Sequence, residues 1–393
     1  MKRFLLFILL FSVLVSGIKF FDLIILTTTL ANSLYLASIG TIILYLILSI
    51  RFKVKLTTFD KGILVFYLGL IINIFVMLLY SNLTLYKTFF GTLNLLGFFF
   101  YFFLKRLKPD TKTVLQIIIV LSFIVSILML AQQVVKPFPL FNHLLEHENF
   151  LVQRGTVRAR IPGMAFVVIS CLYYIELYFQ KFKLKHIILS LFFYVIIILQ
   201  GFRSITLAIS LCIFILYFSS IKKRSFFSVR NLQFILILLI AVIGILQIPY
   251  IQGIINGILE AQKNTVEIGS ENIRINAAIY YLIEIKKHLW MYITGNGLAL
   301  PFKTPDGLFA VDLGIWGFYS LAGLVPTIGL LWLLWKGYCL SPDKFMKLFF
   351  LYMLMNAFLF NAEVLRTGIF YIYSVMFYLL EEKNSNLNDH HKY

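Results

Sequence analysis

The sequence predicts an all-α integral membrane protein with about twelve transmembrane helices. Hydrophobic residues make up 61% of the 393 residues and charged residues 13%, and the mean hydropathy is +0.91. A soluble domain carries about 25% charged residues, so this chain lacks the charge to cover a surface in water. Many of its apolar residues form blocks of roughly 17–25 residues, the length that crosses a bilayer as a helix.

Each apolar block is predicted to be a helix, because apolar and polar residues do not alternate within it as they do in a transmembrane strand. Placed by apolar length, the predicted spans are 4–18, 33–50, 61–80, 84–104, 113–134, 163–179, 186–200, 205–219, 232–250, 314–335, 348–361 and 368–380. Residues 19–32 are also apolar, but Lys19, Asp22 and a run of threonines interrupt them. This segment is predicted to be re-entrant or interfacial.

The basic residues orient these spans, because Lys and Arg concentrate in cytoplasmic loops. With the N-terminus in the cytoplasm, every even-numbered span should end there, and those ends carry the basic clusters. They are Arg51, Lys53, Lys55, Lys105, Arg106, Lys108, Lys181, Lys183, Lys185, Lys222, Lys223, Arg224 and Lys336. Both termini are therefore predicted to be cytoplasmic, and the chain to be a multi-pass protein of the cell (inner) membrane.

The net charge of +18 would suggest nucleic acid as the partner of a soluble protein. Here the positive charge lies in short loops between apolar blocks, so we expect membrane lipid as a partner and no nucleic acid. The cysteines and histidines show no metal-binding spacing, so neither a metal nor a cofactor is predicted.

Two of the predicted outer loops are long, 135–162 and 251–313, within a single membrane domain that covers 1–393. Long loops usually carry function. In the larger loop, between spans nine and ten, residues 271–290 repeat apolar side chains at helical spacing. One face would hold Ile275, Ala278, Ile279, Leu282, Ile285 and Leu289, and the other Arg274, Tyr281, Glu284 and His288. This pattern predicts an amphipathic helix on the outer membrane surface; the alternative is a helix packed on the other outer loops.

Several arginines break the charge rule by lying on the predicted outer side. They are Arg154, Arg158, Arg160, Arg203, Arg274 and Arg366. A guanidinium stays charged and binds phosphate oxygens with two parallel hydrogen bonds. Arginines at the outer membrane surface therefore indicate a phosphate or pyrophosphate ligand presented from the lipid.

Arg203 is the sharpest of these cases, because it sits in a tight outer turn between two predicted helices. A charge so near the hydrocarbon edge is costly unless it is used or paired. The alternative is an arginine that extends its head group to the interface. Arg154, Arg158 and Arg160 precede the sixth span, where pairing with nearby glutamates or with lipid headgroups is the alternative.

Two outer carboxylates are candidates for proton removal, Asp312 and Glu363. Asp312 lies at the outer end of the tenth span, where helix capping is the alternative. Glu363 lies near Arg366, with which it could form a simple ion pair. Glu176 is an intramembrane charge in the sixth span, near its lysine-rich cytoplasmic end.

Four short segments, in this order and spacing, resemble the O-antigen polymerase and O-antigen ligase superfamily of membrane glycosyltransferases. Residues 201–204 (Gly-Phe-Arg-Ser) resemble its Gly-Ser-Arg turn, and Arg160 to Phe166 resembles its Arg-x-x-Gly-x-x-aromatic helix start. Arg274 followed by 294–297 (Thr-Gly-Asn-Gly) resembles its Arg…Gly-x-Gly loop. Residues 312–314 (Asp-Leu-Gly) with the glycine-rich stretch 323–329 resemble the lead into the next helix.

Two departures from the family pattern bear on whether the chain resembles the polymerase branch or the ligase branch. Phe202 stands where the family usually has serine, and no histidine lies near Asp312, where the ligase branch has one. The second departure favours the polymerase branch.

The resemblance implies transfer of a glycan from a polyprenyl diphosphate to a lipid-linked repeat unit at the outer face. It implies Arg203, Arg274 and Asp312 as catalytic residues, and Arg154, Arg158, Arg160, Arg366 and Glu363 as substrate-binding residues. The implied partners are the polyprenyl-diphosphate-linked oligosaccharide, membrane lipid and other polysaccharide-assembly proteins, with no metal or cofactor. The alternatives are a ligase of the same superfamily and a twelve-helix flippase or transporter. The small number of intramembrane charges and the absence of an internal repeat argue against transport.

Overall fold

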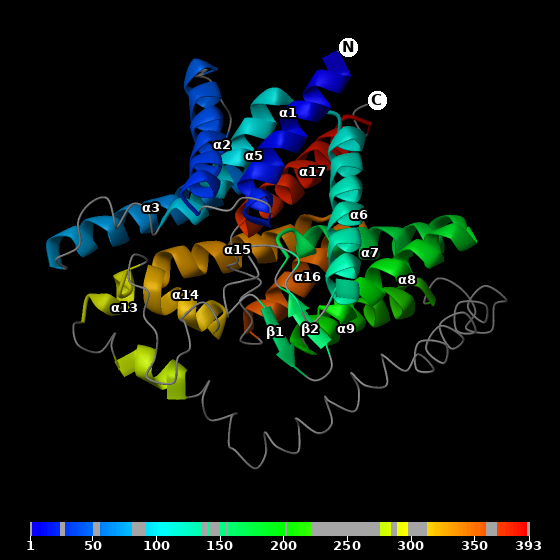
Figure 1. Ribbon diagram of the computed structural model, residues 1–393. Helices are drawn as coiled ribbons and strands as arrows, with labels where there is room; N and C mark the ends of the chain where they lie inside the picture. The colour runs from blue at the N-terminus through cyan, green and yellow to red at the C-terminus, as the bar shows by residue number, and fades with distance from the viewer. Residues whose placement is uncertain are drawn as a thin grey trace.

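The computed structural model describes residues 2–23, 28–49, 56–80, 92–135, 138, 140, 150–153, 156–159, 161–200, 203–221, 276–283, 289–297, 313–358 and 368–390. This part of the chain is almost entirely helical (Figure 1). Two of its helices, Thr58–Leu79 and Thr111–Val135, are long and apolar enough to cross a membrane, and several shorter apolar helices accompany them.

The described elements follow the predicted order closely. They are α1 (Lys2–Gly17), η1 (Phe20–Leu23), α2 (Thr28–Leu48), α3 (Thr58–Tyr80), η2 (Leu93–Phe98), α5 (Phe99–Leu107), α6 (Thr111–Val135), β1 (Phe150–Gln153), β2 (Thr156–Ala159), α7 (Met164–Lys181), α8 (Leu184–Leu199), α9 (Arg203–Ile221), a helix over 276–283, α13 (Met291–Thr294), α14 (Ile315–Ala322), α15 (Leu324–Leu340), α16 (Lys344–Phe358) and α17 (Ile369–His390). The predicted span 232–250 lies outside the described residues.

Three predicted boundaries are wrong. The second helix begins at Thr28 rather than at 33, because threonines that lower the local hydropathy still fit the first turn of a helix. The predicted span 314–335 is two helices, α14 and α15, with a break at Gly323, whose φ is +87°. The last helix runs past 380 to His390, because its polar continuation finds partners on other helices, as described below.

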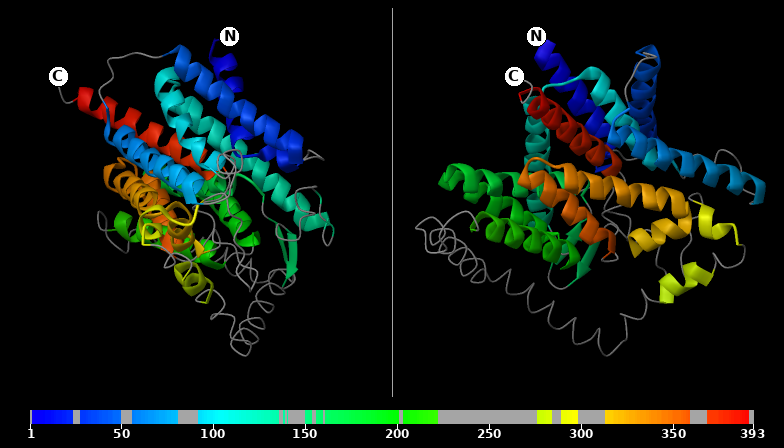
Figure 2. Two further views of the ribbon diagram at one scale, coloured as in Figure 1. Left: turned by 90° about the vertical axis from the view of Figure 1, so that its left-hand side faces the viewer. Right: turned by 180° about the vertical axis from the view of Figure 1, so that it is seen from behind.

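Residues 135–162, predicted to be an outer loop, contain strands that the sequence did not predict. β1 and β2 pair antiparallel, with Leu151 opposite Arg158 and Gln153 opposite Thr156. This hairpin is the departure from an all-α fold among the described residues. It lies at the end of the molecule away from the two termini (Figure 2).

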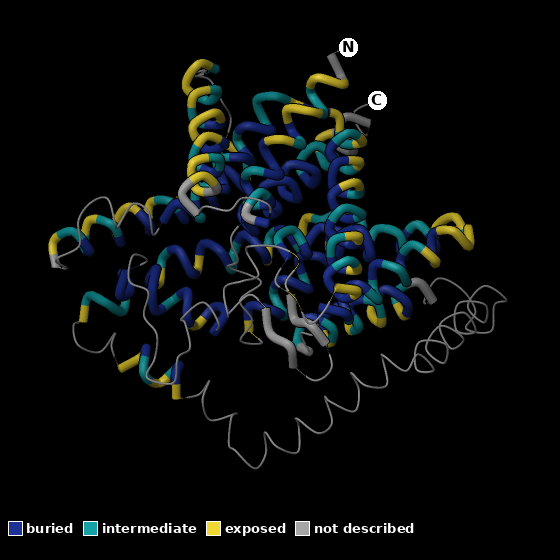
Figure 3. Tube along the Cα trace, viewed as in Figure 1, coloured by how far each residue is buried: buried dark blue, intermediate teal, exposed yellow. Residues whose placement is uncertain are grey.

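The centre of the bundle is packed with aromatic rings. The rings of Phe66, Phe98 and Phe370 come from α3, η2 and α17 and lie 5.0–6.0 Å apart, each fully buried. Outward faces are apolar as well: on α3, Leu68, Phe75 and Leu79 are 57%, 62% and 77% exposed (Figure 3). A helix that is apolar on both faces fits a lipid environment better than water.

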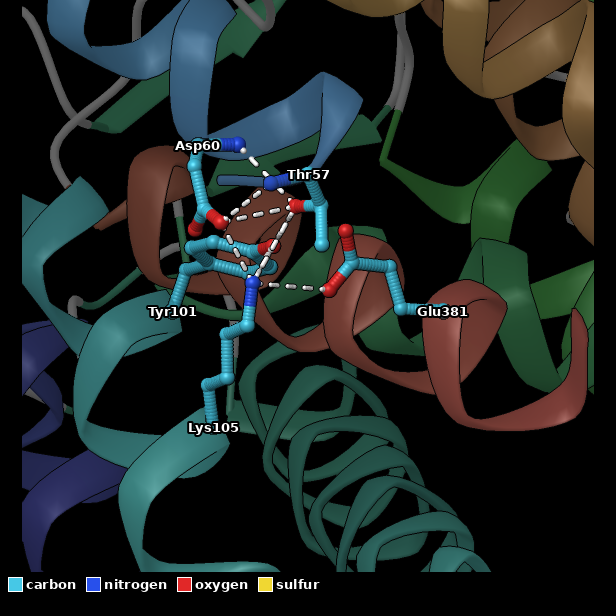
Figure 4. A network of polar contacts seen from close by, with 5 residues as sticks. All are labelled: Thr57, Asp60, Tyr101, Lys105 and Glu381. Carbon is cyan, nitrogen blue, oxygen red and sulfur yellow. Dashed lines mark hydrogen bonds and ion pairs between the residues drawn. The ribbon is translucent and has the colours of Figure 1, made fainter. Parts of the chain in front are cut away.

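One end of the bundle is joined by a polar network around Lys105, in the last turn of α5 (Figure 4). Its Nζ lies 2.5 Å from Oδ2 of Asp60, in the first turn of α3, and 3.5 Å from Oε2 of Glu381, on α17. Asp60 is buried, and its Oδ2 also accepts from the backbone N–H of Thr57 at 2.7 Å. The hydroxyl of Tyr101 lies 3.2 Å from that of Thr57.

A second polar network joins other helices at the same end. The buried carboxylate of Glu176, near the end of α7, accepts from the backbone N–H of Phe345 at 2.7 Å and of Lys344 at 3.3 Å. These N–H groups open α16, where a helix favours a negative charge. Asp343 pairs with Lys383 of α17. The intramembrane charge of Glu176 is therefore explained as a cap of a neighbouring helix.

These contacts bring together the helix ends that the charge rule assigns to the cytoplasm. They join the starts of α3 and α16 to the ends of α5, α7 and α17. At the opposite end, the hydroxyl of Tyr35 on α2 donates to the carbonyl of Leu93 at 2.9 Å, and Gly368 packs on Ile18 at the end of α1. Starts of some helices thus meet the ends of others at each end of the bundle, as in antiparallel packing.

Replacement of Lys105 by methionine is expected to destabilise the folded protein by about 2 kcal/mol, the value of hydrogen bonds to a buried charge. The loss leaves the Asp60 carboxylate with its Thr57 donors alone. Thermal unfolding in detergent measures the change. Lys61→Met is the matched control, since Lys61 is exposed in the same turn as Asp60. Equal unfolding temperatures of Lys105→Met and Lys61→Met would contradict the assigned role of Lys105.

Candidate functional site

The predicted site residues fall mainly on parts of the chain outside the described residues. Those lying outside are Arg154, Arg160, Arg274, Asp312, Glu363 and Arg366. For Arg158 and Arg203 the backbone is described and the side chain is not. The site can therefore be built from the elements that carry these two arginines and from the described residues around them.

Arg158 belongs to β2, and this strand lies against two helix ends. β2 contacts both α6 and α8. The backbone of β2, the strand of Arg158, thus lies beside α8, the helix that precedes Arg203 in the chain.

Arg203 is the first residue of α9, and the turn before it is held by the end of α6. The Nε2 of Gln133 donates to the carbonyl of Leu199, the last residue of α8, at 3.4 Å. The neighbouring Gln132 donates to the carbonyl of Phe138 at 2.9 Å and accepts from the N–H of Leu140 at 2.7 Å. Two adjacent glutamines of α6 therefore fasten the start of the 135–162 loop and the end of α8 side by side.

Gln200 is a residue that the sequence analysis missed. It caps α8 three residues before Arg203, is only 1% exposed, and its Nε2 has no hydrogen-bond partner among the described residues. A buried donor without a partner costs about 1–3 kcal/mol. The sequence feature that could have identified Gln200 is its position as a polar amide three residues before Arg203.

The start of α9 adds donors to the same place. The first N–H groups of a helix have no partner within it, and the helix dipole favours negative charge there. Gln200 lies three residues before that helix start, and the backbones of Arg158 and Arg203 belong to the elements β2 and α9. This arrangement, which we call the α9 donor site, has the chemistry to bind an anion rich in oxygen atoms.

Residues 294–297, which carry the Thr-Gly-Asn-Gly segment, are buried against the break between α14 and α15. The N–H groups of Asn296 and Gly297 donate to the carbonyls of Ser320 and Leu321 at 2.6 and 2.8 Å. On the other side, Nδ2 of Asn73 on α3 donates to the carbonyl of Leu321 at 3.1 Å and also to that of Thr294. The segment is thus locked between α3 and α14.

The residue after Asp312 is also anchored in this region. Leu313 is fully buried, in a small cluster with Ala277, Tyr281 and Leu321. Two buried amide atoms, Oδ1 of Asn73 and Nδ2 of Asn296, have no hydrogen-bond partner within the described part of the chain. The structure therefore ties the chain beside the predicted carboxylate to α14, on the side of the molecule away from the termini (Figure 1).

Among the described residues, no group of three His, Cys, Asp or Glu side chains could hold a metal ion. The expected absence of a metal and of a cofactor stays a prediction.

Comparison with known proteins returned no matching family model, no matching curated protein and no matching solved structure. Membership of the O-antigen polymerase and ligase superfamily stays a prediction, carried by four short segments and by the α9 donor site.

Proposed function

We propose that this chain is a multi-pass glycosyltransferase of the cell (inner) membrane that polymerises a cell-surface polysaccharide, such as capsule or the O-antigen of lipopolysaccharide. The donor is an oligosaccharide on a polyprenyl diphosphate, and the acceptor is a lipid-linked repeat unit at the outer face. The observation that carries this proposal is the contact of β2, the strand of Arg158, with α8, whose end leads into Arg203.

The sidedness of the bundle supports the proposed location of the reaction. The helix termini that carry Lys105 and Lys344 meet at one end of the bundle. The α9 donor site lies at the C-terminal ends of α6 and α8, toward the opposite end of the bundle. With the basic end in the cytoplasm, as the charge rule requires, twelve spans place the arginines at the outer face.

The proposed reaction is a displacement at the anomeric carbon of the donor glycan. An acceptor hydroxyl attacks this carbon, the bond to the diphosphate oxygen breaks, and polyprenyl diphosphate leaves with the bonding electrons. Donors arranged in advance around the developing charge lower the barrier. Arg203 and Arg274 supply that stabilisation, and Asp312 takes the hydroxyl proton. The substrate is held by Arg154, Arg158, Arg160, Arg366 and Glu363.

The experiment that tests this function is the size distribution of surface and lipid-linked glycan in cells that lack the chain, with and without the wild-type copy. Single repeat units on the outer face, restored to a ladder by the wild type, support the polymerase. Long lipid-linked chains that are not attached point instead to the ligase. Units trapped on the cytoplasmic side point to a flippase, and an unchanged glycan excludes all three activities.

Gln200 should contribute to this reaction by donating to the diphosphate. A hydrogen bond to a charged group contributes about 1.5–3 kcal/mol, so Gln200→Leu should reduce polymer formation by about 10- to 100-fold. The variant should fold as stably as the wild type, because replacing an unpartnered buried amide removes a cost. Polymer length in membranes and thermal unfolding in detergent measure the two effects.

Gln133→Leu is the matched control for Gln200→Leu. Gln133 donates to the carbonyl of Leu199, so its loss leaves a buried acceptor without that donor and should lower stability. A Gln200→Leu variant with a normal ladder, or with a stability loss like that of Gln133→Leu, would show that the Gln200 amide serves the fold alone.

A further inference from the structure

The helix over 276–283 packs on the protein through a face that the sequence pattern placed opposite its apolar stripe. Ala277 and Tyr281 are 0% and 1% exposed and form a cluster with Leu313 and with Leu321 of α14. Residues four apart lie on the same face of a helix. The docked face of this helix is therefore the one that contains Tyr281.

The opposite face is partly exposed, and it is mainly aliphatic, with Asn276 as an exposed polar residue at the start of the helix. Ile279, Leu282 and Ile283 are 48%, 39% and 53% exposed. A helix that rests on a protein and faces water carries polar side chains on its outer face. The helix therefore does pack on the protein, as the alternative expected, but of the described stripe residues only Ala278 packs against that cluster, so this packing leaves most of the described stripe unexplained.

Lipid is the occupant that this face fits. Aliphatic side chains offer a glycan no hydrogen bonds, whereas they lower the free energy when they enter the boundary between headgroups and acyl chains. Apolar side chains are also exposed on α14, the helix on which it docks, and on the following α15: Trp316 and Leu324 are 49% and 42% exposed. Tryptophan is enriched at membrane interfaces, and α15 is one of the predicted spans.

We infer that helix 276–283 is an interfacial anchor that lies on the outer leaflet. Tyr281 and Ala277 hold it on α14, and Ile279, Leu282 and Ile283 enter the lipid. The inference goes beyond the proposed function and does not depend on it, because a lipid-facing helix is compatible with a polymerase, a ligase or a transporter.

The test uses the full chain in vesicles of phosphatidylcholine and phosphatidylglycerol, with Cys339→Ser removing the exposed native thiol and leaving two buried ones. Ile279→Cys carries a fluorescent label, and Lys185→Cys, at an exposed site on α8, is the matched control. Nitroxide groups on shallow acyl positions probe lipid contact, and iodide in the buffer probes water contact. Ile283→Cys repeats the measurement should Ile279→Cys fold poorly.

Loss of fluorescence with nitroxide lipid at 279, together with protection from iodide, is the expected result, and the label at 185 should show the reverse. Quenching at 279 by iodide alone would overturn the inference, because the face would then lie in water. Protection from both quenchers would overturn it as well, because protein would then cover the face.

Discussion

Arg203→Ala is expected to abolish the glycan ladder while the protein remains in the membrane at the wild-type amount. In the proposed reaction the guanidinium stabilises charge that develops on the leaving diphosphate, and loss of one such donor typically reduces turnover by about 10²- to 10³-fold. Arg203→Lys should restore part of the activity, because an ammonium keeps the charge and loses the paired donors. Polymer length on gels, compared at equal protein amounts, measures the effect.

Arg106→Ala is the matched control for this loss. Arg106 is a half-buried arginine in the last turn of α5, at the end of the bundle that carries Lys105. Its loss removes the same charge from the opposite end and should leave the ladder intact. A normal ladder in Arg203→Ala, or an equal loss in Arg106→Ala, would contradict the assignment of the reaction to the α9 donor site.

Gly323→Ala is expected to prevent correct folding, with a cost of about 2–5 kcal/mol from a positive φ and from overpacking. Gly323 has a φ of +87° at the break between α14 and α15. An added Cβ would lie 2.7 Å from the Cα of Thr294 and still closer to the carbonyl oxygen of Ile293. It would therefore push residues 294–297 away from α14. The yield of monodisperse protein and its thermal unfolding in detergent measure the change.

Gly40→Ala gives the comparison that isolates this effect. Gly40 lies within α2, and a Cβ added there meets nothing within 4 Å. Alanine is favoured over glycine inside a helix by roughly 0.5–1 kcal/mol, so this variant should be as stable as the wild type or more so. A Gly323→Ala protein that unfolds at the wild-type temperature would show that residues 294–297 are not held against the break.

The sequence alone predicted which helix ends meet, because sidedness is a property of local composition. Lysines follow the apolar blocks that end in the cytoplasm, and the contacts of Lys105 with Asp60 and Glu381 join those same ends. The places of Arg158 and Arg203 at the opposite ends of the helices follow from the same pattern. Helix boundaries were less predictable, since the polar end of α17 is stabilised by partners distant in the sequence, such as Asp343, which pairs with Lys383.

Periodicity could not predict which face of a helix packs against the rest of the protein. The apolar stripe over 275–289 identified a helix, but burial of Tyr281 depends on the shape of α14, which is far away in the sequence. For the same reason, the sequence could not show that the amide of Gln200, at the end of α8, is buried without a partner among the described residues, because its burial depends on how the helices pack.

The composition of this chain thus determined its helical and largely apolar character, because this depends only on the exchange of each segment between water and lipid; its orientation and the outer placement of its arginines stay predictions of the charge pattern. The tertiary structure decided the break at Gly323, the docked face of helix 276–283 and the meeting of β2 with α8. Those features depend on contacts between residues distant in the sequence, and no local pattern specifies which pairs will touch.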